Sequence, residues 1–175
     1  RRGLPNLKTT PDALPCIIKK ENIDFFKKYD VLSEKEVRAR YSAKAEQYAK
    51  LLNIEVNTMV YMTHHLYLPA IIRFSSDLSK SVEAKRAIGI DAPTEKNMVQ
   101  DATDKIAQIT DTVNELEKVN SEAKANDNIQ DEDCAYRDNV IPAMKKLRSL
   151  IDSMEKVCGH EYWPVPSYNK MLFYV

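Results

Sequence analysis

SEKEVRARYSAKAEQYAKLLNIEVNTMVYMTHHLYLPAIIRFSSDLSKSVEAKRAIG, residues 33–89, is the stretch that decides the fold. It opens on a capping box, because the Ser33 hydroxyl can accept the Glu36 amide while the Glu36 carboxylate reaches back to the Ser33 amide. Pro69 predicts a bend, since it lacks an amide hydrogen, and Gly89 predicts the helix end. We therefore expect one long bent helix over residues 34–87. Its apolar stripe recurs every three or four residues: Val37, Tyr41, Ala45, Tyr48, Leu52, Val56, Met59, Met62, Leu66, Ala70, Phe74, Leu78 and Val82.

Two shorter helices are expected to follow the turn after Gly89. Thr94 predicts the N-cap of a helix over residues 95–125. A third helix is predicted over residues 131–158, with a bend at Pro142 inside it and Gly159 as the residue that closes it. Both helices carry an apolar stripe of their own.

The three stripes are close to heptad spacing, and the turns between them are short. Such helices pack as antiparallel neighbours with coiled-coil geometry. The fold class is therefore all-α, a long antiparallel helical bundle over residues 33–160 made of one very long bent helix and two shorter ones. The two shorter helices are expected to cover the long helix from Val56 or Met59 onward.

The segments on either side of the bundle differ from it. Residues 1–32 are expected to be an irregular lead-in with short helices, one capped by Thr10 and one over residues 22–29. Residues 161–175 are predicted to be an extended tail, because the Pro164–Val165–Pro166 sequence disfavours a helix. The tail is too aromatic to stay in water, so we expect it to be a strap that packs on the long helix near Tyr41 and Tyr48, or on other protein.

Composition excludes several classes of function. Lysine plus arginine equals aspartate plus glutamate at 26 each, so there is no basic excess for nucleic acid. No apolar run approaches the roughly 20 residues of a membrane span. Three cysteines in 175 residues indicate a reducing compartment, and hence the cytoplasm. The chain begins with Arg1 rather than methionine, which leads us to expect a piece of a larger protein.

The sequence offers no catalytic, cofactor-binding or metal-binding residue that we would assign. Three glycines are too few for a phosphate-binding loop. Neighbouring histidines on a helix point about 100° apart, so they do not share a metal, and a thiol at a helix C-terminus is not activated. Acidic residues at a helix start and methionines on an apolar stripe have structural explanations. The residues weighed in this way are His64, His65, His160, Cys158, Asp101, Asp104, Asp131, Glu132, Asp133, Met59, Met62, Met144 and Met154.

Several stretches resemble type III glutamine synthetases in order and spacing. Residues 2–15, RGLPNLKTTPDALP, resemble the junction R-G-L-x-N-L-x-T-T-x-D-A-L-P that follows the catalytic domain of that family. Residues 48–59 resemble Y-x-K-x-L-N-I-E-x-x-T-M, and residues 136–138 resemble a Y-R-D helix start. Residues 161–173 resemble the ending E-Y-W-P-x-P-x-Y-x-x-x-L-F. Residues 23–41 are also similar to the helix pair that closes the shorter type I enzymes.

The resemblance implies that residues 1–32 join the bundle to an upstream catalytic domain. It implies a parent enzyme that condenses glutamate with ammonia, using ATP and magnesium or manganese, in a dodecamer of two hexameric rings. The family's catalytic and ligand motifs lie upstream, so none is carried over to this chain, and the chain alone is expected to be inactive. Its expected role is structural, in assembly, with its own catalytic domain and neighbouring subunits as partners. The alternative is a stand-alone helical adaptor without catalytic activity.

Overall fold

The computed structural model describes residue 3, residues 5–166 and residues 168–172, and every regular element among them is helical. The chain divides into two compact units. Unit 1 comprises Arg1–Val56 and Lys118–Pro142, and unit 2 comprises Asn57–Glu117 and Ala143–Val175. The helices α3, α5 and α7, bounded below, each contribute residues to both units. The prediction of an all-α fold is confirmed.

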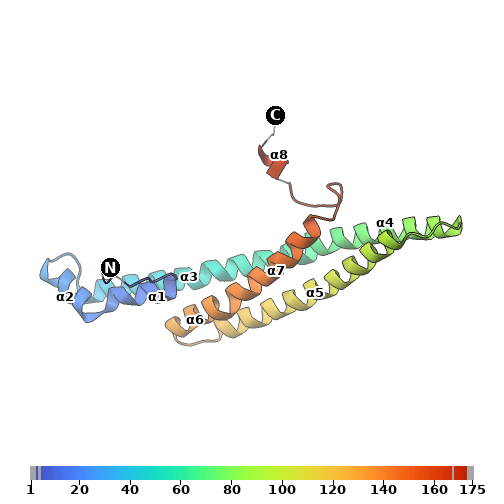
Figure 1. Cartoon of the computed structure of the whole chain (residues 1–175). Helices are drawn as coiled ribbons and strands as arrows, with labels where there is room; N and C mark the ends of the chain where they lie inside the picture. The colour runs from blue at the N-terminus through green and yellow to red at the C-terminus, as the bar shows by residue number, and fades with distance from the viewer. Residues whose placement is uncertain (1–2, 4, 167, 173–175) are drawn as a thin grey trace. The chain divides into compact units, whose positions relative to one another are not determined.

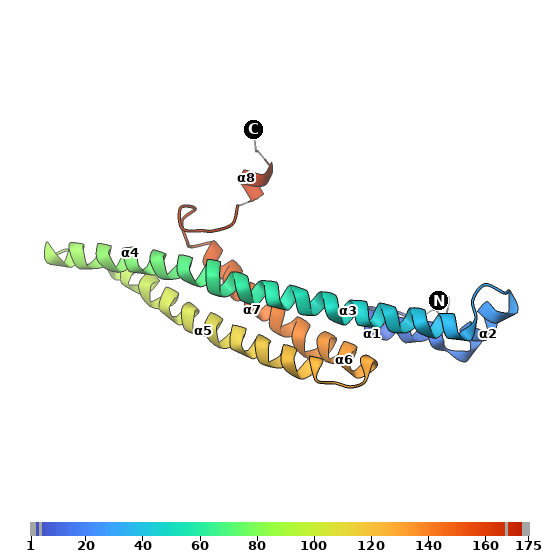
Figure 2. The same cartoon turned by 180° about the vertical axis from the view of Figure 1, so that it is seen from behind.

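The long helix over residues 34–87 is confirmed, and the structure shows how it accommodates its proline. It consists of α3 (Glu34–Met62), a π turn η2 (Thr63–Tyr67) and α4 (Leu68–Ala87) (Figures 1 and 2). Pro69 cannot donate to a carbonyl, and its ring crowds the preceding turn. The preceding turn widens so that the Leu68 amide bonds the Thr63 carbonyl five residues back.

The third helix also has a π turn before its proline. It consists of α6 (Ile129–Ala135), the π turn η3 (Tyr136–Val140) and α7 (Ile141–Glu155). The Ile141 amide bonds the Tyr136 carbonyl, and Pro142 follows directly. In both helices, therefore, a π turn ends two residues before a proline. The second helix, α5 (Pro93–Lys124), has no internal proline and no such interruption.

The predicted ends of the long helix are present at the expected residues. The Ser33 amide donates to the Glu36 carboxylate at 2.7 Å, and the Glu36 amide donates to the Ser33 hydroxyl at 3.3 Å. The hydrogen bond from the Ser33 amide, and next one from the Ser33 hydroxyl to the same carboxylate at 2.7 Å, hold the pKa of Glu36 below its ordinary value. Gly89 has a φ of +80°, and the Ile90 amide bonds the Lys85 carbonyl at 3.0 Å. This six-residue hydrogen bond defines a Schellman motif.

Three other predicted helix ends are wrong. The first short helix, α1 (Thr10–Ala13), has Thr9 rather than Thr10 as its N-cap. The helix α5 begins at Pro93, so Thr94 lies inside its first turn instead of capping it. The helix α7 ends at Glu155, four residues before Gly159, and Gly159 does not have the left-handed φ of a closing glycine. Its carbonyl accepts the amides of Tyr162 and Trp163 in a further turn.

The lead-in contains more helix than expected. After α1 the chain forms a 3-10 helix, η1 (Leu14–Ile18), in place of a stop at Pro15. Next comes α2 (Lys20–Lys28), which begins two residues earlier than predicted. Its last turn closes at Asp30, a non-glycine residue with a φ of +52°. The Val31 amide bonds the Phe26 carbonyl at 3.0 Å, so this is a Schellman motif without its usual glycine.

The two Schellman residues lead to a paired prediction of stability. Asp30→Gly should stabilise the chain by about 0.5–1 kcal/mol, because glycine adopts a positive φ without strain. Gly89→Ala should cost about 1 kcal/mol, since an added Cβ meets open space there and only the backbone conformation resists it. Midpoints of urea unfolding check both. A destabilised Asp30→Gly would contradict the prediction.

In unit 1 the first half of α3 is covered by the chain's own segments. Val37, Ala45, Ala49, Leu52 and Val56 are buried along it. The Tyr41 hydroxyl donates to Gln130 of α6 at 2.6 Å, and Asn120 of α5 donates to Asn53 at 3.0 Å. The expectation that the shorter helices cover the long helix only from Val56 onward is therefore wrong: they reach back to Tyr41.

In unit 2 the helices α4, α5 and α7 bury a second apolar core. The views agree that α4 and α5 run side by side on either side of the turn at residues 88–92 (Figures 1 and 2). Lys85 of α4 pairs with Glu95 of α5, and Lys146 of α7 pairs with Glu115 of α5 at 2.7 Å. Among the described residues of this unit, the apolar side chains that are at most 1% exposed are Ala70, Ile71, Ala102, Ile109, Val113, Leu116 and Leu147.

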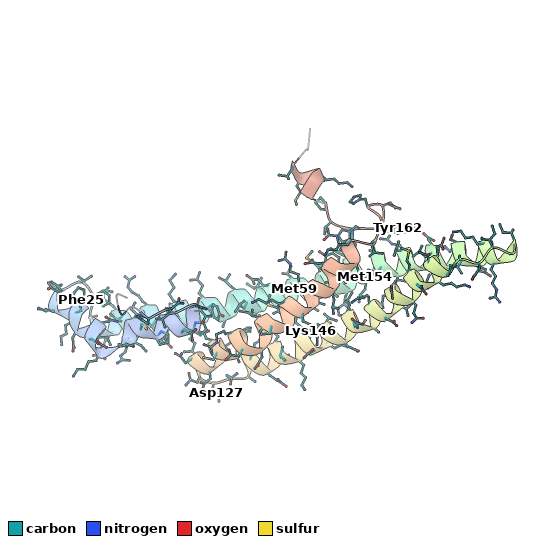
Figure 3. The ribbon with its side chains drawn as sticks, viewed as in Figure 1. Phe25, Met59, Asp127, Lys146, Met154 and Tyr162 are labelled. Atoms are coloured by element: carbon teal, nitrogen blue, oxygen red, sulfur yellow. The ribbon has the colours of Figure 1, made fainter. Side chains whose placement is uncertain are left out.

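The tail is anchored by aromatic contacts at the turn after α7 (Figure 3). Trp163 is 8% exposed, with its ring 5.3 Å from that of Tyr67, and the Tyr162 hydroxyl donates to Asp77 at 2.9 Å. The Tyr162 ring also lies 5.6 Å from that of Phe74. The expected site near Tyr41 and Tyr48 is therefore wrong for these residues.

Nor is the tail extended throughout. The amides of Tyr162 and Trp163 both bond the Gly159 carbonyl, and Tyr168–Leu172 forms the short helix α8. The proline pair therefore separates two turns of helical backbone rather than keeping the whole segment straight. Phe173, the last residue of the stretch that resembles the family's ending, lies outside the described residues.

Candidate functional site

The helix α2 and the turn after it carry an exposed surface, called here the aromatic surface of α2 and defined by Phe25, Tyr29 and Val31. Phe25 is labelled in Figure 3. The helix buries Ile23, which leaves Phe25 and Tyr29 in solvent one turn apart, with rings 5.0 Å from each other. The three side chains are 57%, 59% and 60% exposed. Lys28 lies 5.5 Å from the Tyr29 ring. Large apolar groups gathered in water are typical of a surface that another protein covers.

In unit 1, the helix α6 and the π turn η3 contact α3 and α1. Gln130 of α6 accepts from Tyr41 of α3 and donates to the Pro11 carbonyl of α1 at 3.3 Å. The Arg137 guanidinium of η3 donates to Asp12 of α1 at 2.6 Å. Arg137 also forms two 2.7 Å hydrogen bonds with Asp138, and these, more than any other contact, raise its pKa. These hydrogen bonds hold the lead-in to α6 and η3.

A carboxylic acid is buried at the centre of this arrangement. Asp133 is 3% exposed, and one of its oxygens has no partner among the described residues. Burial, and secondly the charge of Glu132, raise its pKa to about 6. The Tyr136 hydroxyl, one turn on, is also buried without a described partner, and burial together with Glu132 raises its pKa to about 12.

Sequence reasoning missed this pair. Asp131, Glu132 and Asp133 were interpreted together as acids at a helix start, and only the first two remain accessible to water. The signal was available, because extending the apolar stripe of the third helix backward from Val140 by steps of four and three reaches Tyr136 and Asp133. A charged residue type at a core position of that repeat indicates a buried acid.

The histidines and the thiol at residue 158 are not brought together. His64 and His65 are exposed on the π turn η2, where the His65 ring lies 4.5 Å from the Tyr61 ring. His160 is exposed in the turn after α7. Cys158 is buried, and burial raises the pKa of its thiol to about 11, which disfavours the thiolate needed for nucleophilic chemistry.

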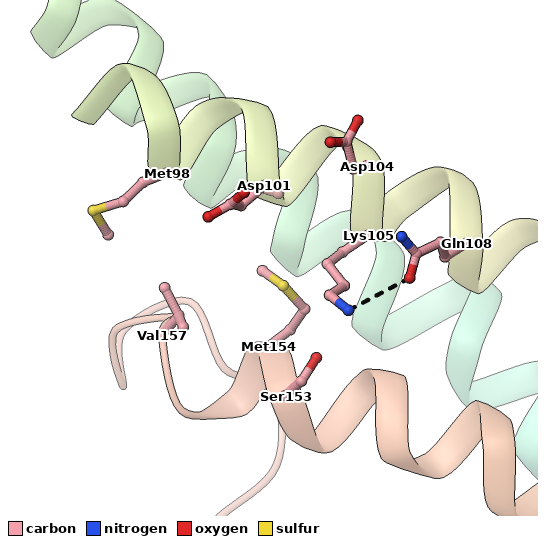
Figure 4. Close-up of a pocket in the computed structure, with 9 residues that line it drawn as sticks. Met98, Asp101, Asp104, Lys105, Gln108, Ser153, Met154 and Val157 are labelled. Atoms are coloured by element: carbon pink, nitrogen blue, oxygen red, sulfur yellow. Dashed lines mark hydrogen bonds between the residues drawn. The ribbon is translucent and has the colours of Figure 1, made fainter. Parts of the chain in front are cut away.

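Asp101 and Asp104 line a shallow groove of about 400 Å³ between α5 and the end of α7 (Figure 4). In that view Met98, Met154 and Val157 face one another, while Asp104 points away from them. Asp104 accepts a 2.9 Å hydrogen bond from Gln100, on its own helix. The two carboxylates therefore do not converge on a common point as a catalytic pair would.

The four methionines weighed above are all at least partly buried: Met154 is buried, and Met59, Met62 and Met144 are partly buried. Met59 and Met62 also line a second groove, of about 350 Å³. The rest of its lining comes from the π turn η2, from α7 and from the tail: Thr63, Tyr67, Arg148, Ile151, Asp152, Glu155, Val165, Pro166 and Met171.

Metal and membrane searches covered the residues that the structure describes. In this part of the chain no group of three or more His, Cys, Asp or Glu side chains is placed to hold a metal ion. Within the same residues, no helix combines the length and the apolar character needed to cross a bilayer.

Comparison with known proteins gives a consistent result. Residues 1–86 match the family described as the glutamine synthetase C-terminal domain. A glutamine synthetase from Butyrivibrio fibrisolvens is 28% identical over 99% of this chain and 25% of its own length. A type-3 glutamine synthetase from Dictyostelium discoideum is 28% identical over 98% of the chain and 24% of its own length. A glutamine synthetase from Bacteroides fragilis is 21% identical over 99% and 25%. The resemblance inferred from the sequence is confirmed, and the chain spans about a quarter of the length of these relatives.

Proposed function

Because residues 1–86 match the glutamine synthetase C-terminal domain family, we propose that this chain is the C-terminal structural and assembly domain of a glutamine synthetase. The parent protein would condense glutamate with ammonia at the expense of ATP, with magnesium or manganese, in the cytoplasm. Among the residues that the structure describes, no cluster is placed to hold a metal ion, and we assign no catalytic step to them. What the chain supplies is a scaffold and a surface.

The observation that carries the assembly role is the aromatic surface of α2. Phe25, Tyr29 and Val31 are each more than half exposed, although α2 already has a buried face with Ile23. Relatives of this chain are about four times its length, so most of each relative is protein that this structure does not contain. We propose that the catalytic domain of the same polypeptide covers this surface, since α2 belongs to the lead-in that resembles the junction to that domain.

A double substitution in the full-length protein tests the docking surface. Phe25→Ser with Tyr29→Ser should lower the melting temperature of the full-length protein, because two large apolar contacts of about 1.5–3 kcal/mol each are lost. The same pair of substitutions should change the stability of the separate 175-residue chain little, because there the surface already faces water. The matched control is Asp24→Ser, an exposed site on the same helix. Thermal melts of both proteins measure the outcome, and a full-length variant as stable as the control would refute docking at this surface.

The purified 175-residue chain should lack glutamine synthetase activity. The reaction needs bound ATP and a divalent metal, and the described residues offer neither a phosphate loop nor a ligand cluster. An assay of γ-glutamyl transfer with ATP and magnesium checks this. Turnover above the level of a buffer blank, retained after chromatography, would show that the chain has a site of its own.

A further inference from the structure

One groove of unit 2 has the size of a small-molecule site. It has a volume of about 350 Å³, and its lining comes from the long helix around the π turn η2, from α7 and from the tail. We call it the methionine groove after Met59, Met62 and Met171, which line it. Small-molecule sites have volumes of roughly 300–1,000 Å³, whereas a stable protein partner covers about 800 Å² of surface. The size of the groove therefore favours a small molecule over a protein.

The apolar part of the methionine groove suits a flexible or aromatic ligand body. Methionine side chains are unbranched and polarisable, so they pack against alkyl and aromatic groups of several shapes. Ile151 of α7 adds a buried branched side chain, and Val165 and Pro166 of the tail border the same groove. Tyr67 contributes an aromatic ring, which Trp163 supports with its own ring 5.3 Å away.

The charges of the methionine groove favour a cation. Its described lining contains one basic side chain, Arg148, and two acidic ones, Asp152 and Glu155, which lie one turn apart on α7. Arg148 and Asp152 approach to 3.5 Å with 74% and 51% of their side chains exposed, so they form a weak pair. Glu155 forms no ion pair or side-chain hydrogen bond with any described residue. One negative charge of this lining is therefore left unbalanced.

The two acids lie beside the aromatic ring of the groove. Burial, and after it the charges of Glu155 and Asp152, raise the pKa of the Tyr67 hydroxyl, while Arg148 opposes them less strongly. Charges that act on the phenol lie near it, because the interaction weakens with distance. The negative end of the groove is therefore next to its apolar lining, and a molecule with an apolar body and one positive end can contact both.

We propose that the methionine groove binds a small organic cation, a molecule with an alkyl or aromatic body and one primary ammonium group. The body packs on Met59, Met62 and Met171, and the ammonium donates hydrogen bonds to Glu155 and Asp152. An ammonium group has three donors and no acceptor, which suits two carboxylates one turn apart. This inference does not depend on the proposed function, because it assigns no step of the glutamine synthetase reaction.

Methyl NMR of the whole 175-residue chain at pH 7 tests the site with three probes that share one body: 4-phenylbutylamine, 4-phenylbutanol and 4-phenylbutyrate. The amine, which is protonated at this pH, should shift the methyls of Met59, Met62 and Met171 along one saturation curve with a Kd of roughly 1–10 mM. Met98, which lines the other groove, is the internal control and should change little. The alcohol should bind about three- to fivefold more weakly than the amine, and the carboxylate more weakly still.

A neutral variant separates the charge from the shape of the groove. Glu155→Gln keeps the size of the side chain, so the affinity for 4-phenylbutylamine should fall about three- to fivefold while that for 4-phenylbutanol stays unchanged. The matched control is Asp111→Asn, at an exposed acid of α5 outside the groove, which should keep the native affinity.

Several results would overturn the cation site. They are equal affinity for the amine and the alcohol, an unchanged affinity for the amine in Glu155→Gln, and amine-induced shifts that do not saturate or that are as large at Met98. Methyls of Met59 and Met62 that shift with protein concentration in the absence of a probe would also overturn it, because they would assign the groove to a second copy of the chain.

Discussion

Leu147→Asp should unfold unit 2. Leu147 is fully buried on α7, and an aspartate there would place an unpaired charge among the apolar side chains of three helices. The cost is several kcal/mol, on the order of the whole stability of a domain. Ile109→Asp, at a fully buried position of α5, should have the same effect. Thermal melts followed by helical circular dichroism measure both.

The matched control for this pair is Asp111→Ala. Asp111 lies two residues after Ile109 and is exposed on the other side of α5. Removal of its carboxylate should change the melting temperature little, because surface substitutions away from caps and pairs are usually within about 0.5 kcal/mol. If Asp111→Ala proved as damaging as Leu147→Asp, the assignment of the core face of α5 would be wrong.

Trp163→Ala should destabilise the chain by about 3 kcal/mol and detach the tail. The indole is nearly buried against Tyr67, so its removal loses the largest apolar contact between the tail and the π turn. Because the indole nitrogen has no partner among the described residues, Trp163→Phe loses no hydrogen bond and should cost only about 1 kcal/mol. Chemical unfolding of the three proteins measures the series.

Tyr162→Phe is the control next to this residue. It keeps the ring beside Phe74 and removes only the exposed hydrogen bond to Asp77. The expected loss is below about 1 kcal/mol. A Trp163→Ala protein as stable as Tyr162→Phe would mean that the indole of Trp163 does not anchor the tail.

The helical architecture could be predicted because it rests on local patterns. Each signal can be recognised from a few neighbouring residues. The apolar stripe from Val37 to Val82 predicts the helix, the capping box at Ser33 predicts its start, and Gly89 predicts its end. The prolines predicted where the regular helix would be disturbed. They did not predict the form of the disturbance, because counting apolar residues at a period of 3.6 does not register the one extra residue of a π turn.

Contacts between distant segments were harder to predict. The tail was predicted to pack on the half of α3 near Tyr41 because the two shorter helices were expected to cover only the other half. In the structure, α6 reaches Tyr41 and Trp163 binds beside Tyr67 instead. Asp133 was missed because acids near a helix start have a common electrostatic explanation, and burial depends on the helix that packs opposite.

The central claim, that the chain is one domain of a glutamine synthetase, is tested most directly by the mass of the natural protein. An antibody raised against residues 95–125 would isolate it from its source cells for intact mass spectrometry. Because the relatives are about four times as long as this chain of 20.1 kDa, we predict a single polypeptide of roughly four times that mass. A natural polypeptide of about 20 kDa would contradict the account and favour the stand-alone adaptor.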